Sequence, residues 1–338
     1  MNSQTPLPSS RTNPFDRLDP EIAQVVATLA FGPLDTRNLA AIRAFAFEFP
    51  ESDATVRSDF EVPGDPDLRV RVIRPRAIDG RPPCLFWMHG GGYVFGAHTM
   101  DDPMLESLCA TLTMVAVSVE YRLAPETPFP GPIDDCYRSL RWVCEHAEAL
   151  GIDSGCIGVG GSSAGGGLAA ALTLVARDRG GPPLAFQLLD QPMLDDRQVT
   201  ASSRQPGLPV WTRESNEFGW RSYLGRLYGS EDVPYTAAPA RADDLSHLPP
   251  AFISVGAVDG LVDEDALYAL RLNAWGVPCE LHVYPGACHG YHIAPSSRVA
   301  IRSRRDVEEW LAHRLGERVW TSEEQQPIFT HPYARSSA

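Results

Sequence analysis

The chain has 338 residues, of which 43% are hydrophobic and 21% are charged, and its formal net charge is −14. This length and composition are those of a globular protein with a sizeable core, in one large α/β domain or two ordinary ones. The excess of carboxylates argues against nucleic acid and anionic membrane surfaces as partners, because both are negatively charged themselves.

The sequence contains no pattern for membrane insertion or export. No apolar stretch reaches the ~18 residues that a membrane span needs, and the polar residues 1–20 lack the apolar core of a signal peptide. The seven cysteines are an odd number and show no CxxC spacing. We therefore expect reduced thiols in a cytoplasmic protein without a membrane partner.

The first 75 residues contain a helical pattern followed by two strands. Between residues 19 and 49 apolar side chains recur at helical spacing, interrupted by Pro33. Residues 55–75 alternate between apolar and charged side chains, as in a pair of edge strands, and the sequence Gly-Asp-Pro-Asp at 64–67 supplies a turn between them. The helical part is too short to fold alone, so we expect it to pack against the rest of the chain.

From Pro83 onward, short apolar runs alternate with longer amphipathic runs. The apolar runs predict buried strands at residues 84–88, 114–119, 156–159, 184–189, 251–255 and 279–284. The longer runs predict helices at residues 133–150, 167–177, 263–275 and 299–315. Such alternation is typical of a mainly parallel, doubly wound sheet.

Two segments do not fit this alternation. One is the N-terminal segment, residues 1–50, and the other is residues 195–228, an insertion rich in proline and aromatic residues. An insertion of this kind can be ordinary loop packing or a lid over a site. We favour a composite cap formed by both segments on a catalytic domain of residues 51–194 and 229–316. The polar tail, residues 317–338, has no assigned role.

A glycine-rich stretch carries the motif G-x-S-x-G in one register only. Residues 161–165 have the sequence Gly-Ser-Ser-Ala-Gly, which places Ser163 rather than Ser162 at the centre. A predicted strand precedes the motif and a predicted helix follows it, as a nucleophile elbow requires. The neighbours must be small because a Cβ would clash with the crossing backbone. The alternative interpretation is a glycine-rich loop that binds phosphate or only turns the chain.

Two polar residues follow strands as the partners of a catalytic serine would. His289 lies in a glycine-flanked loop after the strand at 279–284, where a side chain can reach the carboxyl edge of the sheet. Asp259 ends the loop after the strand at 251–255, whereas its main competitor, Asp263, falls in the first turn of the next helix. The order serine, aspartate, histidine is one in which such triads occur.

The region around residue 289 also contains residue types that bind metals. The residues concerned are His282, Cys288, His289 and His292. Their spacing matches no zinc pattern, and His282 lies within a strand, where it is interpreted as structural. We therefore predict no metal site and no cofactor.

A second glycine-rich stretch can supply donors for an oxyanion. Residues 89–92 have the sequence His-Gly-Gly-Gly and directly follow the strand that ends at Met88. Consecutive glycines allow adjacent N–H groups to face one point, and the residue after the serine, Ala164, adds another donor. His89 itself is interpreted as a residue that fixes the loop through its ring.

Together these motifs resemble the hormone-sensitive-lipase-like branch of the α/β-hydrolases, above all its bacterial carboxylesterases. The resemblance extends from about residue 83 to residue 292, most of the predicted catalytic domain. The matching stretches are His-Gly-Gly-Gly at 89–92, Tyr-Arg-Leu-Ala-Pro-Glu at 121–126, Gly-Ser-Ser-Ala-Gly-Gly at 161–166, Asp-Gly-Leu-Val-Asp-Glu at 259–264, and Tyr-Pro-Gly at 284–286 leading to His-Gly at 289–290.

The resemblance implies a fold, a site and a set of partners. The fold is an α/β-hydrolase fold, a mainly parallel eight-stranded sheet flanked by helices, with a helical cap. The implied catalytic residues are Ser163, Asp259 and His289, and the implied oxyanion-hole donors are Gly91, Gly92 and Ala164. No cofactor is implied, and a homodimer is an option because similar enzymes are often dimers.

Three positions depart from the family pattern. The family usually has Asp or Thr at the position of Ser162, so a hydrogen bond behind the nucleophile must differ. Gly260 replaces the usual proline after the catalytic acid, which leaves that loop looser. Tyr291 replaces a phenylalanine and could add a hydroxyl near the site. These departures bear on pH profile and stability more than on reaction type.

The sequence thus predicts a serine carboxylesterase that hydrolyses short- to medium-chain esters of small molecules through an acyl-enzyme. The candidates to line the substrate pocket are Tyr93, Trp211, Phe218 and Trp220, each of which could instead belong to the core of the cap. Two alternatives remain: an amidase or dedicated hydrolase of one natural ester with the same residues, and a non-catalytic ligand-binding receptor. The presence of all three triad residues argues against the receptor.

Overall fold

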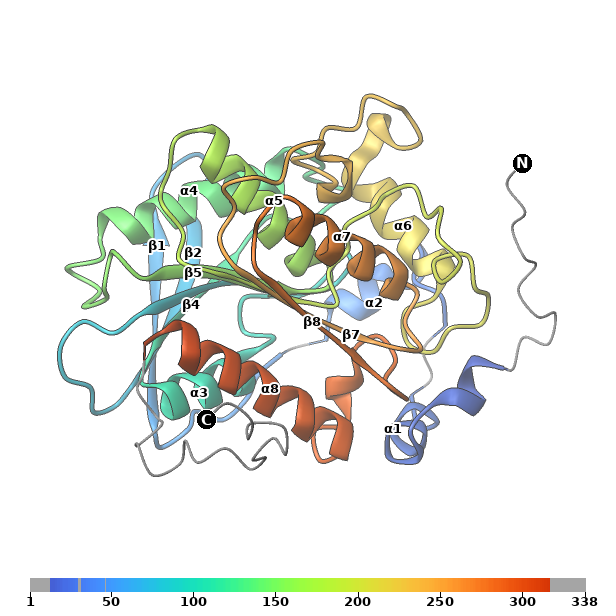
Figure 1. The fold of residues 1–338 in the computed structure, drawn as a ribbon, viewed down its shortest axis with the longest axis horizontal. Helices are drawn as coiled ribbons and strands as arrows, with labels where there is room; N and C mark the ends of the chain where they lie inside the picture. Colours follow the sequence, from blue (N-terminus) through green and yellow to red (C-terminus); the bar gives the residue numbers. More distant parts are fainter. Residues whose placement is uncertain (1–12, 30–31, 46, 317–338) are drawn as a thin grey trace, which may run out of the picture.

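The computed structural model describes residues 13–29, 32–45 and 47–316. In this part of the chain one twisted sheet runs through the molecule, with helices packed on both of its faces (Figure 1). None of the helices described is long and apolar enough to cross a membrane. The predicted tail at 317–338 lies outside the described residues.

The sheet has eight strands in the order β1-β2-β4-β3-β5-β6-β7-β8. The strands are β1 (Thr55–Val62), β2 (Leu68–Pro75), β3 (Cys84–Met88), β4 (Val115–Glu120), β5 (Ile157–Ser162), β6 (Gln187–Asp190), β7 (Ala251–Gly256) and β8 (Cys279–Tyr284). The first two strands pair antiparallel with each other, and β2 pairs antiparallel with β4. All other pairs are parallel, so the carboxyl ends of β3, β5, β6, β7 and β8 meet at one edge.

The strands follow from their residue patterns. Every residue of β3 is buried, as expected of a central parallel strand covered on both faces. The edge strand β1 instead exposes most of its charged side chains, and the turn to β2 is held by a hydrogen bond from Gly64 N to Asp67 Oδ1 (2.9 Å). The sheet therefore becomes progressively more buried toward β3 and β5, where the site residues follow.

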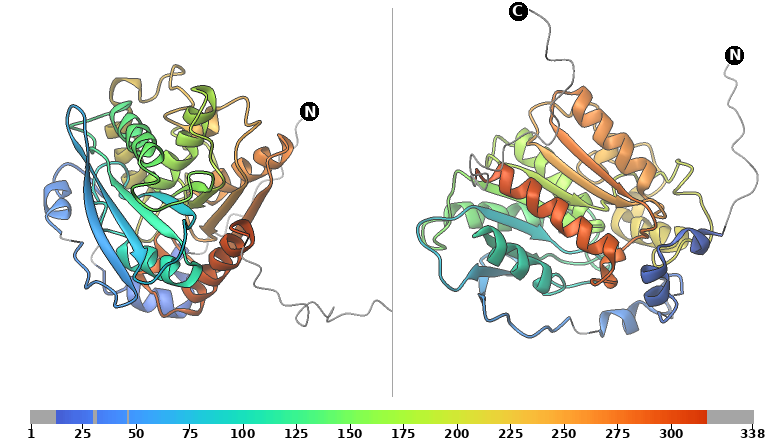
Figure 2. Two further views of the ribbon diagram at one scale, coloured as in Figure 1. Left: turned by 90° about the vertical axis from the view of Figure 1, so that its left-hand side faces the viewer. Right: turned by 60° about the horizontal axis from the view of Figure 1, so that its bottom comes forward.

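Helices cover the two faces of the sheet unequally. One face carries α4 (Gly131–Glu145), α5 (Ala164–Asp178) and α7 (Val262–Ala274), and the other carries α3 (Asp102–Leu112) and α8 (Arg298–Arg314) (Figures 1 and 2). The central helix α5 is buried from Ala164 to Ala176 because alanine and glycine allow it to lie close to the strands. The close packing fixes α5 at the middle of the sheet, and with it the position of its first residue, Ala164.

The N-terminal segment and the insertion after β6 contain short helices. The N-terminal segment holds α1 (Pro20–Val26) and α2 (Leu39–Arg43), and the insertion holds α6 (Arg213–Leu224). Near α1, Asp19 N donates to Gly286 O in the loop after β8 (2.9 Å). Near α2, Leu34 N donates to Ser215 Oγ of α6 (2.9 Å). The N-terminal segment thus contacts both the insertion and the loop that carries His289.

The fold class predicted from the sequence is confirmed, and so are most elements. The main error is α3, which the sequence analysis did not predict. Several boundaries also differ from the prediction. Among the largest shifts are those of the strand predicted from residue 184, which begins at Gln187, the helix predicted from residue 167, which begins at Ala164, and the helix predicted to residue 150, which ends at Glu145. The earlier start matters because it brings the N-terminus of α5 directly against Ser163.

Candidate active site

Ser163 occupies the turn between β5 and α5. Its backbone has φ 56° and ψ −118°, a conformation that an L-residue adopts only under constraint from its surroundings. The constraint comes from close packing of backbone: a Cβ on Gly161 would lie 2.3 Å from the Gly165 carbonyl, and a Cβ on Gly165 would lie 2.0 Å from Met88 O. The two glycines of the motif are therefore required by space, and the serine side chain is directed out of the turn.

Three side chains from three loops form one hydrogen-bonded chain. His289 Nε2 lies 2.8 Å from Ser163 Oγ, and His289 Nδ1 lies 2.7 Å from Asp259 Oδ2. A carboxylate only accepts hydrogen bonds, so Nδ1 carries the proton and Nε2 is left to accept from the serine hydroxyl. Ser163 and His289 are each 7% exposed and Asp259 is 2% exposed. The arrangement can remove a proton from Ser163 Oγ.

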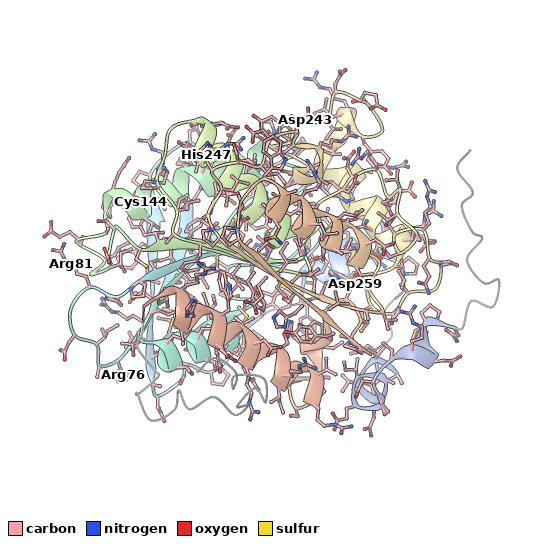
Figure 3. The ribbon with its side chains drawn as sticks, in the orientation of Figure 1. Arg76, Arg81, Cys144, Asp243, His247 and Asp259 are labelled. Carbon is pink, nitrogen blue, oxygen red and sulfur yellow. The ribbon has the colours of Figure 1, made fainter. Side chains whose placement is uncertain are left out.

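The structure distinguishes Asp259 from Asp263. Asp259 follows β7, and its second carboxylate oxygen accepts from Leu261 N (3.0 Å), which fixes the side chain toward His289. Asp263 lies in the first turn of α7 and accepts from Ser202 N (2.8 Å) in the insertion. In Figure 3, Asp259 lies near α7, at the opposite side of the view from Arg81 and Cys144. Only Asp259 of the two is bonded to the histidine.

The glycine loop after β3 lies against the Ser163 turn, since a Cβ on Gly90 would lie 3.5 Å from Ser163 Cβ. Gly91 has φ +109° and Gly92 has φ +59°, left-handed conformations that glycine adopts readily, and Ala164 is the first residue of α5. Within the described part of the chain, none of the N–H groups of these three residues donates a hydrogen bond to a protein acceptor. A helix N-terminus and a glycine loop with free donors can stabilise a developing oxyanion.

His89 is held as a structural residue beside these donors. Its ring stacks on Tyr121 with centroids 4.3 Å apart, its Nδ1 lies 2.7 Å from Gly90 O, and its carbonyl accepts from Tyr121 Oη (2.8 Å). Burial lowers the pKa of His89 to about 4, so the ring is neutral at neutral pH. The contacts fit the predicted loop-fixing role.

The three departures from the family pattern have visible local consequences. Ser162 Oγ donates to Asp190 Oδ2 (2.9 Å), which is the hydrogen bond behind the elbow. The Tyr291 hydroxyl lies 2.5 Å from Ser303 Oγ of α8, so it faces that helix. A Cβ on Gly260 would meet Leu208 Cδ1 at 2.9 Å, so the insertion packs closely on the loop after Asp259.

The four aromatic pocket candidates occupy different environments. Trp211 lies over the glycine loop that follows β3: a Cβ on Gly92 would come within 2.4 Å of its Cη2, and its ring centroid is 5.9 Å from that of His289. Trp220 and Tyr93 are fully buried and pack together at 5.3 Å. Phe218 is partly buried against the same core. Of the four, Trp211 alone has its ring packed against that of His289.

His282, which the sequence analysis interpreted as structural, lies between two carboxylates. Its Nε2 is 2.7 Å from Glu280 Oε1 and its Nδ1 is 3.1 Å from Asp306 Oδ2. No group of three or more side chains suited to a metal ion occurs in the described ranges. His292 is bonded to Asp190 instead (3.3 Å).

Asp190 and Gln191 were not among the candidates predicted from the sequence. Both lie at the carboxyl end of β6, between the strands that lead to Ser163 and Asp259, and both are bonded to residues next to the candidate site. The sequence offered one signal for them: two polar residues at the carboxyl end of a predicted strand, where sites lie in folds of this kind.

The chain is similar in sequence and in structure to known hydrolases and esterases. Residues 85–293 match the family model described as the alpha/beta hydrolase fold. Carboxylesterase NlhH of Mycobacterium tuberculosis is 41% identical over 228 residues, 67% of this chain and 71% of that protein. Ethyl acetate hydrolase of Pseudomonas putida is 31% identical over 233 residues, 66% of this chain and 71% of that protein. The solved structure of a bacterial heroin esterase has a TM-score of 0.82 at 39% identity and covers 89% of this chain and 99% of its own.

Proposed function

The chain belongs to the α/β-hydrolase fold family, in its hormone-sensitive-lipase-like branch of carboxylesterases, and from this premise we propose that Ser163, His289 and Asp259 hydrolyse carboxylic esters. The enzyme is a carboxylic ester hydrolase, as its relatives are. The observation that carries the assignment of residues is the continuous hydrogen-bond chain from Asp259 through His289 to Ser163.

Each step of the reaction corresponds to one of these contacts. Ser163 Oγ attacks the ester carbonyl and passes its proton to His289 Nε2, while Asp259 holds the ring and stabilises the imidazolium. The tetrahedral intermediate collapses, the C–O bond to the alcohol breaks, and the alcohol leaves with the proton from His289. Water then attacks the acyl-enzyme in the same manner and releases the acid and Ser163.

The oxyanion of both tetrahedral intermediates is assigned to the N–H groups of Gly91, Gly92 and Ala164. Support comes from their free N–H groups and from the left-handed backbone at the two glycines. In comparable sites, loss of one such donor costs about 3–4 kcal/mol of transition-state stabilisation. No metal or organic cofactor takes part in this proposal.

We assign the substrate pocket to a cap of residues 1–50 and 195–228. Support for the assignment comes from α6, which approaches the oxyanion loop so closely that a Cβ on Gly219 would lie 2.8 Å from Gly92 O. Further support comes from the hydrogen bond between Leu34 and Ser215, which joins the two segments. A cap packed this near the nucleophile restricts the space for the acyl or alcohol group and favours short to medium chains.

The preferred chain length is tested with p-nitrophenyl esters from acetyl to dodecanoyl. We expect the largest kcat/KM at or below medium chain length, in keeping with the relative named for ethyl acetate. A steady rise of kcat/KM up to dodecanoyl would overturn the short-chain assignment. No turnover of any ester, together with turnover of anilides, would assign the same residues to an amidase.

Trp211 is expected to limit the length of the substrate. A tight three-residue turn positions it: Trp211 N donates to Pro209 O (2.7 Å) across Val210, whose φ of +63° is strained for a β-branched residue. Its Nε1 donates to Asn216 Oδ1 (3.0 Å), which fixes the ring over Gly92. We predict that Trp211→Ala raises the octanoyl-to-acetyl ratio of kcat/KM by about tenfold or more, because removal of the indole opens space.

The control for Trp211→Ala is Trp142→Ala. Trp142 lies on α4, where it stacks on His146 away from Ser163, and its loss should leave the octanoyl-to-acetyl ratio unchanged. An unchanged ratio in Trp211→Ala, with the protein folded, would remove Trp211 from the pocket and leave it as part of the cap core.

We further propose that the enzyme acts in the cytoplasm on dissolved small-molecule esters. The net charge of −14 supports the absence of a nucleic-acid partner. All seven cysteines lie in the described residues and are unpaired, which fits a reducing compartment. Burial raises the pKa of the Cys84 and Cys136 thiols well above the usual range. Because the thiolate is the reactive form, we expect thiol reagents to leave the activity unchanged.

A further inference from the structure

Asp190 ends β6 directly beside the nucleophile. In the sheet it pairs with Ser162 of β5 on one side and with Ser254 of β7 on the other. Its carbonyl oxygen accepts a hydrogen bond from Ser163 N (2.8 Å). The backbone of Asp190 therefore fixes the position of the serine itself.

The Asp190 carboxylate joins this strand end to three other parts of the site. Four side-chain donors reach it: Ser162 Oγ (2.9 Å) and Gln191 Nε2 (3.0 Å) at Oδ2, and Ser254 Oγ (2.8 Å) and His292 Nε2 (3.3 Å) at Oδ1. Two donors saturate each oxygen, so the carboxylate has little freedom to rotate. One partly buried carboxylate thus connects β5, β7 and the loop after β8.

The charge of Asp190 is retained despite its burial. Desolvation alone would raise the pKa of this carboxyl, but the positive charge of His292 and the hydrogen bonds from His292, Gln191 and Ser254 outweigh it and hold the pKa at about 2. Partial desolvation would lower the pKa of His292, whose side chain is 43% exposed, but the charge of Asp190 and its hydrogen bond outweigh this effect and raise the pKa. Asp190 is accordingly an ionised acceptor throughout the neutral range.

Gln191 extends the connection to the catalytic histidine. Its Nε2 donates to Asp190, and its Oε1 accepts from Gly290 N (2.7 Å), the residue directly after His289. The side chain is 1% exposed, and the backbone has φ +48°, in the left-handed region where glutamine is uncommon. Such conformations persist where the surroundings require them, and they cluster at functional sites.

We propose that Gln191 is a positioning residue that holds the His289 ring at its distance from Ser163. The inference rests on the proposed function, in which these two residues are base and nucleophile. The elbow is anchored to Asp190, and the histidine loop is anchored through His292 to Asp190 and through Gly290 to Gln191. Of these two links, the amide of Gln191 is the one that holds the residue directly after His289. A proton transfer across 2.8 Å depends on this distance, and a misplacement of about 1 Å can cost ~100-fold in rate.

The test is the kinetics of Gln191→Met and Gln191→Asn on p-nitrophenyl butyrate. Methionine has a similar length but no hydrogen-bonding amide, and asparagine keeps the amide but is too short to span Asp190 and Gly290. We expect kcat to fall by about 10- to 100-fold in both variants, with KM within about twofold of wild type, because Gln191 acts on the chemical step through His289.

The matched control is Gln187→Met at the other end of β6. Gln187 is also buried and donates through Nε2 to Pro249 O (2.9 Å), away from the site. Its replacement removes a buried amide from the same strand, and we expect kcat to stay within about twofold of wild type even if the melting temperature falls.

Three results would overturn the inference. They are a folded Gln191→Met or Gln191→Asn enzyme with wild-type kcat, a change confined to KM, and an equal loss of kcat in Gln187→Met. Because asparagine is the milder replacement, Gln191→Asn decides the question if Gln191→Met does not fold. A wild-type enzyme without esterase activity is a different outcome, since it would overturn the proposed function first.

Discussion

Ser163→Ala is expected to lower kcat/KM for p-nitrophenyl butyrate by about 10⁴-fold or more, with the fold intact. The mutation removes the atom to which His289 Nε2 is hydrogen-bonded, Ser163 Oγ at 2.8 Å, and leaves the glycines of the turn unchanged. The measurement is steady-state hydrolysis together with circular dichroism and thermal unfolding.

The neighbouring serine supplies the comparison. Ser162 Oγ is bonded to Asp190 and not to His289, so Ser162→Ala should cost only about tenfold or less. If Ser162→Ala were as inactive as Ser163→Ala, or if Ser163→Ala kept a tenth of the wild-type activity, the assignment of the nucleophile would be wrong.

Asp259→Asn is expected to lower kcat by about 10⁴-fold, the loss seen when a triad aspartate becomes an amide. The amide can donate to His289 Nδ1, which favours the tautomer with the proton on Nε2, and that nitrogen can then no longer accept from Ser163. Because Asp259 is 2% exposed, solvent does not replace the lost carboxylate. The measurement is kcat for p-nitrophenyl butyrate, with the melting temperature recorded for each variant.

Asp263→Asn is the matched control for Asp259→Asn. It removes a carboxylate four residues later that accepts from Ser202 N, so it weakens one contact of the insertion and leaves His289 untouched. We expect kcat within about twofold of wild type. Equal losses in the two variants would indicate damage to the insertion rather than to the triad.

The positions of the candidate triad could be predicted because each residue follows a strand. Ser163, Asp259 and His289 come after β5, β7 and β8, and parallel strands bring their carboxyl ends to one edge. The choice of Asp259 over Asp263 could also be made from the local sequence, because Asp263 falls in the first turn of the next helix. The proposed oxyanion loop could be selected for a similar reason, because its glycines directly follow β3.

Other features depend on contacts that no local pattern contains. Gln191 reaches Gly290 because of the register between β6 and its neighbours and the left-handed backbone at Gln191 itself. Trp211 could be named as an aromatic residue of the insertion, but its place over Gly92 results from how the insertion folds back. Such contacts follow only from the assembled sheet.

The sequence does contain a signal for helix α3, although this helix was not predicted. Leu105, Leu108, Cys109 and Leu112 recur at helical spacing and are all buried against the sheet. The run is short, begins with Asp-Asp-Pro and follows a glycine-rich loop, so it resembles a continuation of that loop. The proline is nevertheless compatible with a helix, because it lies in the first turn.

The most direct test of the account is covalent labelling by a p-nitrophenyl alkylphosphonate, followed by intact mass spectrometry and peptide mapping. The phosphonate requires a serine oxygen activated by a base, and its adduct resembles the tetrahedral intermediate. The account predicts one adduct per chain, on Ser163, that is absent in Ser163→Ala and forms much more slowly in His289→Ala. An adduct on Ser162, or labelling that persists in Ser163→Ala, would contradict it.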